Sequence, residues 1–177
     1  EGATIRYTTD GSEPTSNSQT FKKPFYIKTS TNFKMKGFKN GNENSFTEEA
    51  SFLKLPYRRT ISYTHPYSHL YTAGGNNGLI DGINGEPNAF GGWQGFYGDD
   101  SEVIVDLEKV RTFSTIKTTY LQQYASWIWI PTEVEYSVST DGKKFKSVYV
   151  EKNKVPENED GSFVKAFTAT LPGTKAR

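Results

Sequence analysis

Cysteine is absent from this chain of 177 residues, and methionine occurs only once. The lack of cysteine excludes disulfide bridges, cysteine-ligated zinc clusters and thiol catalysis. Hydrophobic residues make up only 34% of the chain. No apolar run approaches the length of about 20 residues that a membrane-spanning helix needs, so we expect no membrane partner.

An excess of either charge is also missing, because the net charge at pH 7 is +1. A domain dedicated to nucleic acid normally carries a clear basic excess, so we expect no nucleic-acid partner. The patterns of common hydrolases are absent too: the sequence contains no Asp-Glu dipeptide and no Ser/His/Asp arrangement with supporting context. Asp99 and Asp100 follow Gly98 in an expected turn, where paired acids are solvated. We therefore expect no enzymatic activity in this chain.

Aromatic residues are abundant at 15%, and they accompany 16 glycines. Tyr, Phe and Thr favour strands, and no segment shows sustained helical periodicity. The sequence therefore predicts an all-β protein. The expected strands are residues 5–8, 25–27, 33–38, 45–52, 103–107, 113–121, 133–139, 145–150 and 163–171.

Two domains are expected, with a boundary near Pro56. Residues 1–55 contain short strands and tight turns, which predicts a small immunoglobulin-like sandwich. Residues 56–177 contain more strands without intervening helices, which predicts a second antiparallel sandwich. Arg58 and Arg59, which follow Pro56, are expected to lie in a short exposed connection.

Residues 5–15 read IRYTTDGSEPT, a strand followed by a dense turn signal. This motif resembles the signature of the chitobiase/β-hexosaminidase C-terminal domain. The resemblance implies a structural spacer that follows the catalytic domain of a glycoside hydrolase.

The second part of the chain resembles the discoidin, or coagulation-factor type C, domain family. The matching pieces are LIDG at 79–82, WQGF at 93–96, VIVDL at 103–107 and YSVSTDGKKF at 136–145. The resemblance implies a discoidin-like jelly-roll sandwich that binds carbohydrate. The family pattern continues beyond the point that corresponds to Arg177, so the resemblance also implies that the last strands are incomplete.

The same resemblance implies a structural calcium ion in the glycine-rich segment 76–96. The implied ligands are the Asp81 carboxylate and the backbone carbonyl groups of Gly78 and Ile83, with Asn84 as a substitute ligand. The alternative is that Asp81 only caps a turn through hydrogen bonds to backbone amides.

Sugar rings are held by an aromatic face and a few polar groups, and loops carry such residues most often. The candidate sugar-binding residues are Tyr67, His69, Tyr71, Trp93, Gln94, Tyr97 and Tyr124. Two roles are open for Trp93, as a sugar platform or as an anchor of the sandwich. His65 and His69 lack a third metal ligand, so a packed or surface loop is the better interpretation.

Trp127 and Trp129 lie in the apolar run 126–130, which Pro131 ends. Residues two apart share one face of any strand they occupy, so these tryptophans are expected to pack in the interior rather than to bind ligand.

Together, the two resemblances imply a non-catalytic carbohydrate-binding and spacer region of a bacterial glycoside hydrolase. They imply glycans with N-acetylhexosamine or galactose as partners, and an upstream catalytic domain of the β-N-acetylhexosaminidase type. The implied location is outside the cytoplasm: periplasmic, associated with the outer membrane, or extracellular. The alternative is a structural or cell-surface interaction module without a sugar site.

Overall fold

The computed structural model describes residues 2–40, 44–88 and 90–177, and the chain divides into two compact units, Glu1–Pro56 and Tyr57–Arg177. Both units are built from antiparallel strands, which confirms the predicted all-β class. None of the helices among the described residues is long and apolar enough to cross a membrane.

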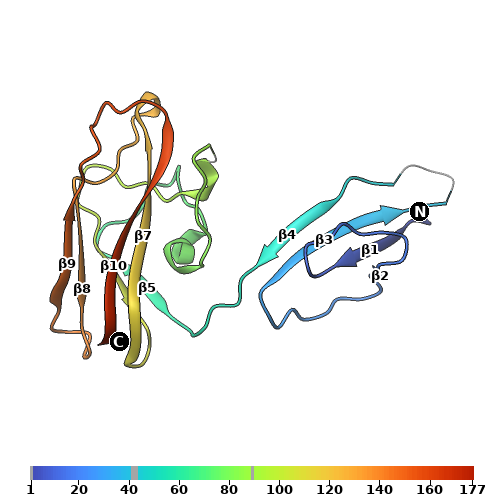
Figure 1. The fold of residues 1–177 in the computed structure, drawn as a ribbon, viewed down its shortest axis with the longest axis horizontal. Coiled ribbons are helices and arrows are strands. Elements are labelled where there is room, and N and C mark those ends of the chain that lie inside the picture. The colour runs from blue at the N-terminus through green and yellow to red at the C-terminus, as the bar shows by residue number, and fades with distance from the viewer. Residues whose placement is uncertain (1, 41–43, 89) are drawn as a thin grey trace. The chain divides into compact units, whose positions relative to one another are not determined.

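The first unit is a four-stranded sheet in the order β2-β1-β3-β4 (Figure 1). Its strands are β1 Thr4–Thr8, β2 Gln19–Thr20, β3 Thr31–Phe38 and β4 Glu48–Phe52. The ring of Tyr7 stacks on Phe25 and on Phe33, each at 5.2 Å between ring centroids. The predicted strand 25–27 is wrong, because this segment pairs with no other strand. Pro24 cannot donate a backbone hydrogen bond, and Phe25 is held by ring stacking instead.

The described residues of the second unit form three antiparallel strand pairs: β5 with β6, β7 with β10, and β8 with β9. Figure 1 shows the β8–β9 pair on one side of the long β7–β10 pair and the loop-rich segment on the other. The strands are β5 Thr60–Tyr63, β6 Val103–Asp106, β7 Arg111–Gln123, β8 Glu133–Val138, β9 Lys146–Lys152 and β10 Ser162–Ala176.

The core of the second unit forms where β8 faces β10. Val134 and Tyr136 of β8 are buried, while the residues between them are exposed, as their alternation predicted. Phe167 of β10 is fully buried, and the Tyr136 hydroxyl donates to its carbonyl oxygen at 3.0 Å. The same hydroxyl lies 2.6 Å from the Thr118 Oγ1, so this buried polar group is fully engaged.

In the part of the chain that the structure describes, three short 3₁₀ helices lie in the loops: η1 Gly75–Ile80, η2 Phe90–Gly92 and η3 Tyr124–Ser126. Gln123, the last residue of β7, pairs with Ser162, the first residue of β10. Since η3 follows β7 directly, it lies at the opposite end of the β7–β10 pair from the C-terminus (Figure 1).

Candidate functional site

The glycine-rich segment and the residues just before it, from Ala73 on, are held together by side chains that donate to backbone carbonyl groups. The Gln94 Nε2 donates to the carbonyl oxygens of Ala73 at 3.3 Å and Gly75 at 2.6 Å. Its Oε1 accepts from the Tyr63 hydroxyl at 3.0 Å, and that hydroxyl also lies 3.2 Å from the Asn76 carbonyl oxygen. Burial raises the pKa of Tyr63 above its ordinary value, so the hydroxyl keeps its proton. Gln94, a candidate sugar contact, thus uses both its donor and its acceptor group within the loop.

Arg59 completes this arrangement at the end of η1. Its Nε and Nη2 donate to the carbonyl oxygen of Ile80 at 2.9 and 2.6 Å. Arg59 is half-buried, so the expectation that it lies in an exposed connection is wrong. A guanidinium that donates twice to one carbonyl makes a charge-assisted contact, which is stronger than a neutral hydrogen bond. We call the side chains of Arg59, Tyr63 and Gln94 the loop brace.

Among the predicted calcium ligands Asp81 is the one carboxylate, and the others are the carbonyl groups of Gly78 and Ile83, with Asn84 as a substitute. Calcium prefers about six to eight oxygen ligands. Asp81 accepts the backbone amide of Ile83 at 2.8 Å through Oδ1, which is the turn-capping role left open above. Across the described ranges, no group of three or more His, Cys, Asp or Glu side chains could hold a metal ion. The carbonyl oxygens that accept from the loop brace are those of Ala73, Gly75, Asn76 and Ile80, and they do not include the implied calcium ligands Gly78 and Ile83.

The glycines of this segment permit close packing around Asp81. Gly74 has a φ of 68°, and a Cβ there would lie 2.6 Å from the Asp81 Oδ2. A Cβ at Gly78 would lie 1.8 Å from the carbonyl oxygen of Ala73, so only glycine fits there. The two remaining implied ligands, Ile83 and Asn84, have exposed side chains.

Trp93 behaves as an anchor of the loop. Its Nε1 donates to the carbonyl oxygen of Glu86 at 3.0 Å. Its ring lies so close to Gly85 that a Cβ there would come within 2.3 Å of the indole. Tyr67 is held in a similar way, since its hydroxyl donates to the Asn76 Oδ1 at 2.8 Å. Of the two roles open for Trp93, these contacts favour the anchor.

Three other candidate sugar contacts are exposed on the residues that flank the segment. His69 and Tyr71 project from the part before η1, and a Cβ at Gly95 would touch the Tyr71 ring at 3.0 Å. Tyr97 is 97% exposed and is the most accessible aromatic ring of the predicted set. Tyr124, the seventh candidate, lies in η3, a different loop.

A second group of exposed aromatic rings surrounds η3. Trp127 is 81% exposed and Trp129 is 43% exposed, so the prediction that they pack in the interior is wrong. Their ring centroids are 5.8 Å apart, and their planes meet at 74°. Tyr124 is 46% exposed, and its carbonyl oxygen accepts the Trp127 amide at 3.0 Å. We call these three residues the tryptophan corner.

The physical reason for this exposure is a change in backbone direction. Trp127 has φ 59° and ψ 41°, the left-handed region, so residues 126–130 do not continue as a strand. Gln123 and Ile128 exchange two backbone hydrogen bonds, at 2.9 and 3.2 Å, which close the turn. Ile130 then enters the core at 4% exposure. The tryptophans alternate with these isoleucines and therefore point outward.

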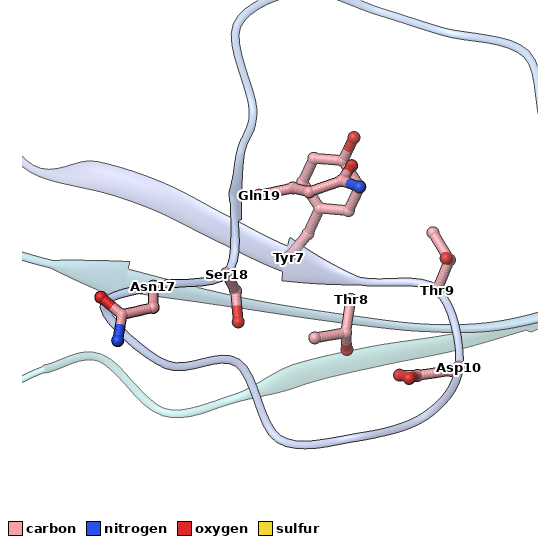
Figure 2. Close-up of a pocket in the computed structure, with 7 residues that line it drawn as sticks. All are labelled: Tyr7, Thr8, Thr9, Asp10, Asn17, Ser18 and Gln19. Atoms are coloured by element: carbon pink, nitrogen blue, oxygen red, sulfur yellow. The ribbon is translucent and has the colours of Figure 1, made fainter.

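The first unit contains an open polar hollow of about 280 Å³ (Figure 2). Asp10, in its wall, accepts from the amide of Ser12 at 3.0 Å and from its hydroxyl at 2.6 Å. These two hydrogen bonds lower the pKa of the Asp10 carboxyl group below its ordinary value. The carboxylate therefore serves the turn of the TTDGS motif. The lining residues are Tyr7, Thr8, Thr9, Asp10, Asn17, Ser18 and Gln19.

An ion pair of the second unit joins Arg177 to Asp106 of β6. Arg177 donates from Nε and Nη2 to the two carboxylate oxygens of Asp106, each at 3.1 Å. This contact lowers the pKa of Asp106, with a further contribution from the Glu108 amide. Asp99 and Asp100, the only adjacent acid pair considered above, are both exposed.

Comparison with known families gives two matches along the chain. The model of the chitobiase/beta-hexosaminidase C-terminal domain matches residues 1–49, and that of the F5/8 type C domain matches residues 61–177. The chain belongs to the F5/8 type C domain family. A comparison with curated proteins found no match.

The F5/8 type C domain is the discoidin-like sandwich that the sequence motifs implied, and it follows the chitobiase-type domain in the expected order. Both are non-catalytic accessory domains, which supports a carbohydrate-binding accessory module. Sequence reasoning missed Arg59, Tyr63 and the two tryptophans of the corner. The only signal for the tryptophans was their type, because large aromatic residues in a loop are common in binding surfaces.

Proposed function

We propose that this chain is the non-catalytic glycan-binding and spacer region of an exported glycoside hydrolase. The F5/8 type C domain binds glycans that contain N-acetylhexosamine or galactose. The chitobiase-type domain separates it from an upstream catalytic domain of the β-N-acetylhexosaminidase type. The region works outside the cytoplasm, where such glycans occur in polymers and on cell surfaces.

The observation that carries this proposal is the exposure of aromatic rings on the loops of the F5/8 type C domain. The C–H groups of a sugar ring carry a slight positive charge, and an aromatic face carries a slight negative one. Tyr97 and Trp127 each expose most of their surface on loops, where a sugar can reach them. Large aromatic side chains are mostly buried in folded domains, so rings this exposed indicate a surface for contact with another molecule.

The test is titration of the chain with N-acetylglucosamine, N-acetylgalactosamine and galactose oligosaccharides in a calorimeter, beside a glycan array. We expect millimolar or tighter binding to at least one of these classes. Co-sedimentation with vesicles of neutral and anionic lipids serves as the comparison, and we expect the protein to stay in the supernatant. Binding to no sugar of either class would leave the structural spacer, without a sugar site, as the better account.

A further inference from the structure

We propose that the tryptophan corner is the surface that contacts the glycan, and that it receives one uncharged pyranose ring at the end of a glycan chain. This inference rests on the function proposed above, because it names the site and the class of ligand for that function. The site is distinct from residues 67–97, which contain all the sugar contacts expected from the sequence except Tyr124.

The first argument is the combination of exposure and backbone strain at Trp127. Among the described residues, only Glu108 and Trp127 adopt a positive φ without being glycine. A bulky side chain is rare in the left-handed region, where glycine or asparagine is accommodated more easily. Tryptophan at this position contributes little burial, since it is 81% exposed. Strained residues gather at functional sites, and an exposed indole there indicates ligand contact.

The second argument is that the corner is held rigid before any ligand arrives. The Trp129 Nε1 donates to the carbonyl oxygen of Glu157 at 3.0 Å, which fixes this indole against the loop before β10. The paired hydrogen bonds between Gln123 and Ile128 close the turn that carries Trp127. A binding surface that is already ordered loses little conformational entropy on binding.

The third argument concerns the shape of the ligand. The two indole planes meet at 74°, so they form an angled corner and not one flat surface. A flat polysaccharide surface would need coplanar rings to contact several sugars at once. A single terminal ring can place one face against Trp127 and one edge toward Trp129. The corner therefore fits the end of a chain.

The charges around the tryptophan corner favour an uncharged glycan over an anionic lipid surface. Residues 124–130 carry no charged side chain, and residues 156–161 contribute Glu157, Glu159 and Asp160 without any lysine or arginine. Exposed tryptophans also occur in proteins that enter lipid interfaces. Anionic lipid headgroups attract basic side chains, and here the neighbouring segment is acidic, so it repels them. An uncharged glycan suits both the aromatic and the electrostatic character of the corner.

The test compares sugar binding by the unaltered chain with binding by Trp127→Gly, a change that the left-handed backbone accommodates. We expect affinity to fall at least tenfold for the sugar that the unaltered chain binds. Tyr26→Ala is the matched control, because Tyr26 is 93% exposed in the first unit, and we expect it to bind as the unaltered chain does. Tyr97→Ala tests the rival surface beside the glycine-rich segment.

The indole N–H signals of the unaltered chain give a second measurement that needs no variant. Sugar should shift the NMR signals of Trp127 and Trp129 and leave that of Trp93 in place. Equal affinity in Trp127→Gly, a loss only in Tyr97→Ala, or a shift of Trp93 alone would overturn the corner and leave the proposed function intact. Failure of the unaltered chain to bind any sugar, or its binding to vesicles instead, would overturn both.

Discussion

The loop brace leads to a prediction about what stabilises the F5/8 type C domain. Replacing Arg59 by alanine removes both donors from the Ile80 carbonyl oxygen, which lies on a buried residue. A hydrogen bond from a charged group contributes about 1.5–3 kcal/mol. Because both donors share one acceptor and the guanidinium is half-exposed, we expect a loss of about 2 kcal/mol in the free energy of unfolding. In a unit of this size that loss lowers the Tm by roughly 6–8 °C.

The assay is differential scanning calorimetry of the whole chain, with the transition of the second unit followed separately. Arg59→Lys is the control, since it keeps the charge but cannot donate twice from a planar group, and we expect a smaller fall in Tm. The unaltered chain is also heated with EDTA and with calcium chloride. An ion present at 100 times its Kd would stabilise the domain by about 2.7 kcal/mol, which is easily seen as a rise in Tm.

We expect neither EDTA nor calcium to move the Tm of the unaltered chain, because Asp81 caps its turn and the loop brace holds the carbonyl oxygens of Asn76 and Ile80. A fall of several degrees with EDTA would refute this reasoning and restore the calcium site implied by the family. An unchanged Tm in Arg59→Ala would also refute the reasoning, because the contact of Arg59 with the Ile80 carbonyl oxygen would then contribute nothing to stability.

Three further predictions concern the same domain. Tyr136→Phe leaves the Phe167 carbonyl oxygen without its buried donor, so urea titration should show a loss of about 1–2 kcal/mol in unfolding free energy. Trp127→Gly should change the free energy of unfolding by less than about 1 kcal/mol, because relief of about 1–2 kcal/mol of left-handed backbone strain offsets the lost packing. Trp127→Ala keeps the strain, so we expect it to be less stable than the glycine variant. The pKa of Asp106 is lower in the folded chain, beside Arg177, than in the unfolded chain. As the pH falls, Asp106 therefore binds a proton in the unfolded chain before it does so in the folded chain. Its stabilisation is therefore present above the unfolded pKa of about 3.9 and is lost as the pH falls through the lower folded value. Thermal melts from pH 6 down to pH 2 should show a shallower acid loss in Asp106→Asn, and equal slopes would contradict this.

Much of the fold could be predicted because strand alternation is a local property. In β8, Val134 and Tyr136 alternate with polar residues, and the structure buries the expected face. Segment 25–27 shows the limit of this reasoning. Three apolar residues after Pro24 resemble a strand, yet Phe25 is held by stacking on Tyr7, a contact between residues far apart in sequence. Pattern alone does not reveal such a partner.

The candidate site was harder to predict because its contacts cross long stretches of chain. Arg59 reaches a carbonyl group 21 residues away, and the Tyr63 hydroxyl reaches Gln94 over 31 residues. Nothing near Arg59 in the sequence distinguishes it from Arg58, which is exposed and lies 3.8 Å from Glu108. Sequence composition identified the glycine-rich segment as unusual, but two of the three residues that organise it, Arg59 and Tyr63, come from outside the segment.

In the run 127–130 the alternation of tryptophan and isoleucine was recognised correctly, but the prediction of which set is buried was wrong. Tryptophan and isoleucine alternate, and a shift of one residue would exchange the two sets between interior and surface. The larger rings would bury more apolar area, so burial alone favours tryptophans inside. The structure instead buries Ile130 against Val134 and exposes Trp127, with a left-handed residue to make the change of face. The domain exposes its largest apolar rings, one of them at a strained position. It is therefore less stable than it would be if the tryptophans were buried in place of the isoleucines. The proposed ligand contact at the tryptophan corner would account for this arrangement, and the comparison of Trp127→Gly with the unaltered chain tests it.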